Sequence, residues 1–153
     1  MMNSNFWLLG IHRKLIATGT DTDGAYDFIA GHVPPGIRTP PHIHHQYAET
    51  EFVVEGELNI VTEQGTLHLK AGEGYTIPKG MPHALQALGD KPAKIITIFA
   101  PAGFAEVVKA VGIPGMVEEG MPAATTDMAL FNTLSSAIGD ETIKRPGAAF
   151  TLA

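Results

Sequence analysis

The sequence of 153 residues contains no cysteine. This absence excludes disulfide bonds, thiolate metal ligands and thiol nucleophiles, but it does not fix the cellular compartment. Long apolar runs are also missing: near the N-terminus the apolar patch spans only Phe6 to Leu9 and is followed by Arg13 and Lys14. Such a patch is too short for a secretory signal, and no run reaches the length of a membrane helix. We therefore expect a cytoplasmic protein without a membrane partner.

Positive charge is scarce as well. The chain has 10 Lys and Arg against 16 Asp and Glu, a formal net charge of −6. No basic cluster is longer than Arg13-Lys14 or Lys144-Arg145, so a positively charged surface that binds a phosphate backbone is not expected, and nucleic acid is not the expected partner. The length and the 44% hydrophobic content predict one compact domain with a sizeable core.

Residues 11–99 break into short β-type runs separated by turn-forming residues such as Asp23-Gly24 and Pro78-Lys79-Gly80. The runs are IHRKLIA, AYDFIAGHV, PHIHH, EFVVEGELNIVT, GTLHLK, GYTI, HALQAL and AKIITIFA. In GTLHLK the residues Leu67 and Leu69 fall on one face, whereas AKIITIFA is apolar almost throughout and is expected to be covered on both faces. This pattern predicts an all-β sandwich or barrel.

After Pro101 the spacing of the apolar residues changes from the two-residue period of strands to a helical period. The apolar positions of AGFAEVVKAVG recur at helical spacing and end at Gly112, which predicts a short helix packed on a sheet. Its apolar residues are Phe104, Val107, Val108 and Val111. A second helix is expected at about 126–138, with Met128, Phe131, Leu134 and Ile138 on one side, and no element is indicated after Asp140. We expect a barrel over residues 1–112 and a helical and loop extension over 113–153 that packs on the barrel or on a partner.

The stretch from Gly36 to Gly56 is rich in histidine. His42 and His44 lie two residues apart, so on a strand they project from the same face, while His45 points the other way. Glu49 follows after a short turn-like segment, and His83 opens a strand further along the chain. Three imidazoles and one carboxylate without a thiolate suit one divalent transition metal (Fe, Mn, Ni, Co, Cu or Zn) rather than Ca or Mg. Four protein ligands also leave coordination positions open, as a catalytic metal requires.

The spacing of these residues resembles the two motifs of the cupin superfamily. The first motif is matched by Gly36, His42, His44, Glu49 and Gly56, and the second by Gly72, Pro78, Lys79, Gly80 and His83. The Asn usually found four residues after this histidine is replaced by Ala87, which removes a polar group beside His83. Over residues 6–112 the sequence is similar to the small single-domain bacterial cupins related to quercetin dioxygenases.

The resemblance implies a double-stranded β-helix, or jelly-roll barrel, that holds one metal through His42, His44, Glu49 and His83. It also implies a metal-dependent dioxygenase acting on an enolizable or aromatic hydroxy compound, with Glu49 as the base. The alternatives are an isomerase, lyase or hydrolase that does not use dioxygen, and a non-catalytic small-molecule-binding protein. A homodimer formed through an outer sheet is the expected assembly, in which the FWLLG segment or the C-terminal tail crosses to the partner.

The remaining polar and aromatic residues have simpler interpretations. Glu51 shares strand parity with Glu49, but its spacing to Gly56 disfavours it as a ligand. Candidates for the wall of a substrate pocket are Tyr47, Met81 and Phe104, because the first two flank ligands and the third begins a helix. His12, His32 and His68 are expected to be ordinary strand residues. Because imidazoles with a reference pKa of about 6.5 must lose a proton to bind metal, the affinity is expected to fall below about pH 6.

Overall fold

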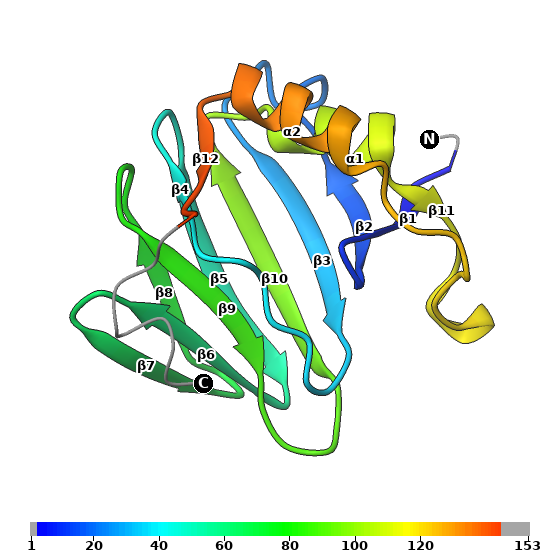
Figure 1. Cartoon of the computed structure of the whole chain (residues 1–153). Helices are drawn as coiled ribbons and strands as arrows, with labels where there is room; N and C mark the ends of the chain where they lie inside the picture. Colours follow the sequence, from blue (N-terminus) through cyan, green and yellow to red (C-terminus); the bar gives the residue numbers. More distant parts are fainter. Residues whose placement is uncertain (1–2, 145–153) are drawn as a thin grey trace.

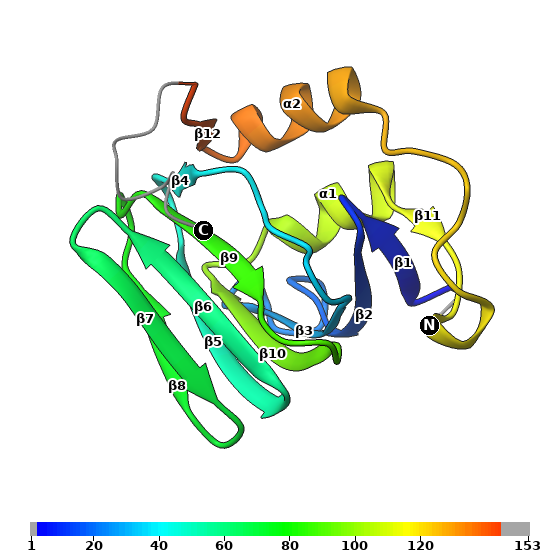
Figure 2. The ribbon, with the colours of Figure 1, turned by 60° about the horizontal axis from the view of Figure 1, so that its bottom comes forward.

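Two antiparallel sheets make up most of the structure, a computed structural model that describes residues 3–144 (Figure 1). The larger sheet contains, in spatial order, β11 (Ile113–Pro114), β1 (Asn5–Leu8), β2 (Ile11–Ala17), β3 (Asp27–Val33), β10 (Ala93–Ala100), β5 (Ala48–Glu55) and β8 (Gly74–Ile77). The smaller sheet contains β12 (Asp140–Thr142), β4 (His42–His44), β9 (His83–Ala87), β6 (Glu57–Thr62) and β7 (Gly65–Lys70). The two sheets form the predicted all-β jelly-roll barrel (Figure 2).

The strand boundaries follow the sequence pattern closely. β2, β7, β8 and β10 coincide with four of the predicted runs, and the run EFVVEGELNIVT is divided at Gly56 into β5 and β6. Gly56 has a φ of 80°, and a Cβ at this position would lie 2.7 Å from the carbonyl oxygen of Pro92. Only glycine therefore fits this turn without strain. β1 pairs with β2 and β11 of its own chain, so the FWLLG segment has its strand partners within the barrel.

The prediction that AKIITIFA is covered on both faces is wrong for the single chain. Along β10 the inward residues are buried, whereas the outward residues Ile96 and Ile98 are only half-buried and Lys94 is exposed. On the neighbouring strand β5, Phe52 is 41% exposed and Val54 is 45% exposed. The outer face of the larger sheet therefore carries apolar side chains that the chain itself leaves partly open.

Two short helices follow the barrel strands, as predicted. α1 (Phe104–Val111) buries its apolar face against β1 and β3 and ends at Gly112. α2 (Met128–Ala137) is capped by Asp127, whose side chain accepts a hydrogen bond from the backbone N–H of Leu130 at 3.1 Å. The predicted apolar side of α2 packs on the core through Phe131, Leu134 and Ile138, but Met128 is 46% exposed. A 3₁₀ turn, η1 (Val117–Glu119), lies between the helices.

The extension returns to the barrel after α2. α2 lies beside α1, and the chain then turns at Gly139 into β12, which pairs with β4 (Figures 1 and 2). In this register Asp140 lies opposite His44. The sequence indicated no element after Asp140, because this three-residue strand is stabilised by its partner rather than by its own pattern. Residues 145–153 of the predicted extension lie outside the described residues.

The core consists mainly of two apolar clusters. One lies between α1 and the larger sheet and includes Phe99 and Phe104, and the other lies between the two sheets and includes Leu58 and Ile95. No helix within residues 3–144 combines the length and apolarity that crossing a membrane requires.

Candidate metal centre

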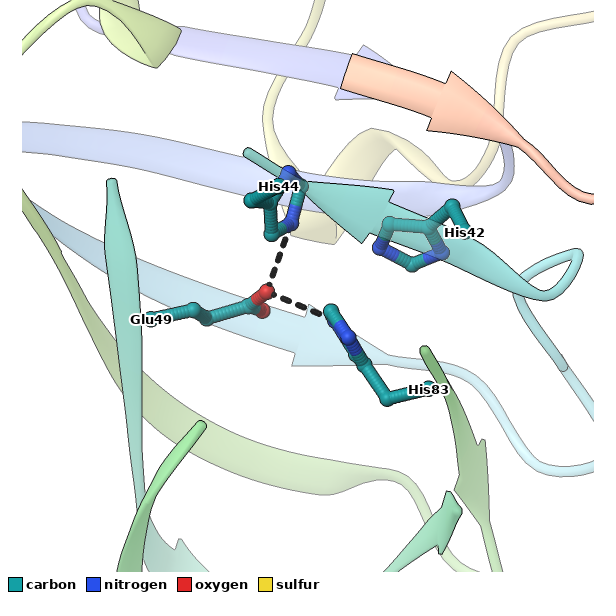
Figure 3. A group of neighbouring side chains, drawn as sticks. All are labelled: His42, His44, Glu49 and His83. Carbon is teal, nitrogen blue, oxygen red and sulfur yellow. Dashed lines mark hydrogen bonds and ion pairs between the residues drawn. The ribbon is translucent and has the colours of Figure 1, made fainter. Parts of the chain in front are cut away.

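The structure brings the four predicted metal ligands together from three strands. His42 and His44 project from the same face of β4, Glu49 comes from β5, and His83 is the first residue of β9 and pairs in register with His42. One candidate ligand atom from each residue lies within 4.8 Å of the others. Figure 3 shows the carboxylate of Glu49 between the rings of His44 and His83, with His42 beside them.

The distances within this cluster are those of direct polar contacts. Nε2 of His44 lies 2.8 Å and Nε2 of His83 lies 3.0 Å from the same oxygen, Oε2 of Glu49 (Figure 3). The ring centroids of His42 and His83 are 4.3 Å apart. His83 is fully buried, and Glu49 and His44 are 2% and 5% exposed. The polar atoms thus converge at a point where three of the four side chains are buried.

The tautomers of the three histidines fit a bound metal. Nδ1 of His42 lies 2.7 Å from the carbonyl oxygen of Pro40, and Nδ1 of His83 lies 2.9 Å from that of Met81. Nδ1 of His44 lies 2.7 Å from Oδ1 of Asp140. Because carbonyl and carboxylate oxygens only accept, each Nδ1 carries a donated proton, which leaves Nε2 of each ring as the atom that can bind a metal once the contacts of His44 and His83 with Glu49 are replaced. Three imidazole nitrogens and one carboxylate oxygen suit a borderline divalent transition metal.

Burial and neighbouring charges set the protonation of the cluster. Burial, followed by the proximity of His83 and His44, lowers the pKa of His42 to about 3. Burial alone would also lower the pKa of His44, but its hydrogen bonds to Asp140 and Glu49 outweigh burial and raise the pKa to about 9. Burial opposes ionisation of Glu49, but hydrogen bonds from His44 and His83 hold the pKa of this carboxyl well below its ordinary value. Without metal, His44 therefore holds a proton that an ion has to replace.

Glu51 and His45, the two neighbours disfavoured as ligands, lie outside this cluster. Glu51 is fully buried and accepts a hydrogen bond from the hydroxyl of Thr97 at 2.9 Å. Burial and the charge of Glu49 raise the pKa of Glu51 well above its ordinary value, which disfavours a second carboxylate anion beside Glu49. His45 is exposed and pairs with Glu141 at 2.8 Å.

The three pocket candidates have different surroundings. Phe104 lines a cavity that opens beside His42, His44 and Glu49. Tyr47 is buried, stacks on the ring of His44 at 4.4 Å between centroids and donates its hydroxyl to Asp140. The side chain of Met81 packs on the core cluster between the sheets. Contact of Tyr47, Met81 and Phe104 with a substrate stays a prediction.

Two residues near the cluster were missed by sequence reasoning. Asp140 is separated from His44 by 96 positions, and no local motif marked it. Arg13 lines the same cavity from β2, where it lies on the same strand face as the buried residues Ile11 and Leu15. The sequence signal for Arg13 was a charged residue at a strand position that points inward together with apolar residues.

Asp140 is expected to act as a positioning residue for His44. Replacing it by asparagine keeps an acceptor for Nδ1 but removes the charge that strengthens this hydrogen bond, so the metal affinity is expected to fall by about 10- to 100-fold. Competition against a chromophoric chelator measures this loss. The control is Glu141→Gln, because Glu141 is the adjacent acid on β12 and pairs with a histidine outside the cluster. Equal affinities of the two variants would contradict the assignment.

Comparisons with known proteins point to one family. A family model described as a cupin domain matches residues 31–99. A probable germin-like protein (subfamily 2 member 5) of Arabidopsis thaliana is 36% identical over 73 residues, which cover 44% of this chain and 34% of the relative. Quercetin 2,3-dioxygenase of Bacillus subtilis is 25% identical over 104 residues, which cover 68% of this chain and 30% of the relative. The chain thus spans about a third of the length of these relatives.

The comparison with solved structures concerns the fold. The structure of KdgF from Halomonas sp. aligns with a TM-score of 0.53 at 24% identity and covers 60% of this chain and 81% of the other. At this identity the similarity supports the barrel fold and not an activity.

Proposed function

We propose an enzymatic, metal-dependent function for this chain, on the premise that it belongs to the cupin superfamily. The observation that carries the proposal is the convergence of three imidazole nitrogens and one carboxylate beside a cavity. The function it supports best is a mononuclear dioxygenase of the quercetinase type, acting on an enolizable or aromatic hydroxy compound. The similarity to quercetin 2,3-dioxygenase over 68% of the chain supports this reaction class.

The residues have separate roles in this proposal. A divalent Fe, Mn, Ni, Co, Cu or Zn ion held by His42, His44, Glu49 and His83 would polarise a substrate oxygen and offer open coordination positions. Glu49 faces the cavity in its ionised form and accepts the proton of the substrate hydroxyl or enol. The neutral carboxyl of Glu51 donates a hydrogen bond to Glu49 and keeps that carboxylate in place.

The cavity walls complete the site. Phe99 and Phe104 line it with their rings 4.5 Å apart between centroids, and α2 contributes Phe131. These apolar side chains accommodate the hydrocarbon part of a substrate and limit the access of water to the reacting atoms.

Turnover with and without oxygen tests the reaction class. We expect the metal-loaded protein to convert members of a panel of flavonols, diketones and sugars in air and to stop when oxygen is removed, because the proposed reaction consumes dioxygen. Oxygen uptake and product analysis on the same samples measure the oxygen dependence of turnover. Identical rates without oxygen would contradict the dioxygenase assignment. They would indicate an isomerase, lyase or hydrolase in which Glu49 moves a proton. Binding without turnover would indicate a non-catalytic small-molecule-binding protein.

We also propose that the protein is a homodimer that pairs through the outer face of the larger sheet. The partly open apolar side chains of β5 and β10 support this, since such a face is stabilised when a second copy covers it. Residues 1–112 are proposed as the barrel and 113–153 as an extension that packs on it, with α2 and β12 making the contact. The cytoplasmic location and the lack of a nucleic-acid partner stay predictions.

A further inference from the structure

Arg13 is a buried cation, and two of its side-chain nitrogens have no hydrogen-bond partner among residues 3–144. Its side chain extends inward from β2, and the residue is 6% exposed. These nitrogens, Nε and Nη1, are themselves buried. Among residues 3–144, none of the ion pairs within 4.0 Å involves Arg13.

This arrangement is costly without a ligand. A guanidinium remains charged at any physiological pH, and a buried charge is normally paired and hydrogen-bonded. The guanidinium carbon lies 5.8 Å from the centre of the Phe104 ring, which compensates the charge only in part. Glu51 interacts with Arg13 electrostatically, but its carboxyl is already engaged by Thr97 and Glu49. The buried N–H groups are therefore available to an acceptor from outside the chain.

The surroundings of Arg13 place it on the wall of the cavity. In the β2–β3 pairing it lies opposite Gly31, where a side chain would collide with Ile95, since a Cβ would come within 2.8 Å of that residue. Arg13 lines the same cavity as His42, His44 and Glu49. Apolar side chains, Leu8, Phe99, Phe104 and Phe131 among them, form much of the remaining wall. The cavity thus combines a fixed positive charge and the proposed metal ligands with an apolar interior.

We propose that Arg13 is the anion-binding residue of this cavity and that the substrate is a small organic acid with an apolar body. Its carboxylate pairs with the guanidinium of Arg13, and its hydroxyl or enolizable carbonyl faces Glu49 and the three histidines. The fork of N–H donors on arginine matches the two oxygens of a carboxylate, which gives both affinity and orientation. This inference rests on the proposed function and narrows its substrate class to acids.

Binding of a matched acid and amide tests the role of Arg13. The probes are mandelate and its neutral isostere mandelamide, titrated calorimetrically into zinc-loaded and metal-free protein. We expect mandelate to bind about 10- to 100-fold more tightly than mandelamide to both forms, the range that a charge-assisted pair contributes. Equal affinities in the parent protein would overturn the proposal.

Substitutions in β2 test whether the preference for mandelate over mandelamide depends on Arg13. Arg13→Met is expected to abolish the preference for the acid, and Arg13→Lys to retain part of it, because lysine keeps the charge and loses the fork. Lys14→Met is the matched control, since Lys14 is the next residue on the same strand and is exposed. A preference that persists in Arg13→Met would overturn the proposal, because the metal or another residue would then hold the carboxylate.

Measurements on the same samples distinguish a variant that does not fold from a folded variant that has lost the anion site. Thermal unfolding reports whether each variant folds, and if Arg13→Met does not, an unchanged preference in Arg13→Lys overturns the assignment. The preference in metal-free protein does not depend on turnover, so it tests the anion site even if the dioxygenase reaction is not found. Conversely, turnover of neutral compounds without a preference for acids would leave the proposed function standing and reject the anion site alone.

Discussion

Replacing His44 by alanine is expected to remove nearly all bound transition metal from the purified protein, whereas the parent is expected to carry about one ion per chain. Nε2 of His44 is one of the converging ligand atoms, and its Nδ1 connects the site to Asp140. The variant loses this ligand and leaves the carboxylates of Glu49 and Asp140 without a shared partner. We expect the affinity to fall by more than about 100-fold, beyond the usual effect of a residue that only supports a ligand.

His45→Ala is the matched control for this experiment. His45 is the next residue along the chain, but it is exposed and pairs with Glu141 on the surface. Its replacement is expected to leave the metal content at the parental value when both variants are measured by elemental analysis. Circular dichroism and thermal unfolding confirm that both are folded. Equal and negligible metal in the parent and His44→Ala would reject the metal site.

The metal affinity of the parent protein is expected to rise about tenfold for each pH unit between about pH 7 and 9, and then to level off. The physical reason is the pKa of His44, which its hydrogen bonds to Asp140 and Glu49 raise to about 9 against the opposing effect of burial. Below this pH the metal-free site holds a proton that the ion must displace, so the affinity falls as the pH falls. His42, whose pKa is lowered to about 3, is already neutral and adds no dependence in this range.

The reference pKa of imidazole alone places the loss of affinity below about pH 6, whereas the raised pKa of His44 places it at a higher pH. Chelator competition at pH 6, 7, 8 and 9 measures the slope, and calorimetry in buffers of different ionisation enthalpy counts the released protons. About one proton per ion is expected at neutral pH. An affinity that does not change between pH 7 and 9 would contradict the assignment of the proton to His44.

The candidate ligands were predictable from the sequence because their arrangement depends on local geometry. Alternation along a strand separates His44 from His45, and the turns at Gly56 and Gly80 allow the strands to return to the same barrel. The β-type runs and the helix that ends at Gly112 were likewise indicated by patterns within a few residues of one another. Such patterns determine which way a side chain points, whatever the rest of the chain does.

Contacts between distant segments required the tertiary structure. The pairing of β12 with β4 brings Asp140 to His44 across 96 positions and thereby sets the pKa of a ligand, and no local pattern specifies that register. Burial likewise leaves Nε and Nη1 of Arg13 without a hydrogen-bond partner among residues 3–144, because the closing of the barrel removes this side chain from water. The sequence by itself determined which of the candidate ligands share one face of a strand. The tertiary structure decided their protonation and their unmet interactions, since both depend on what the fold packs around them.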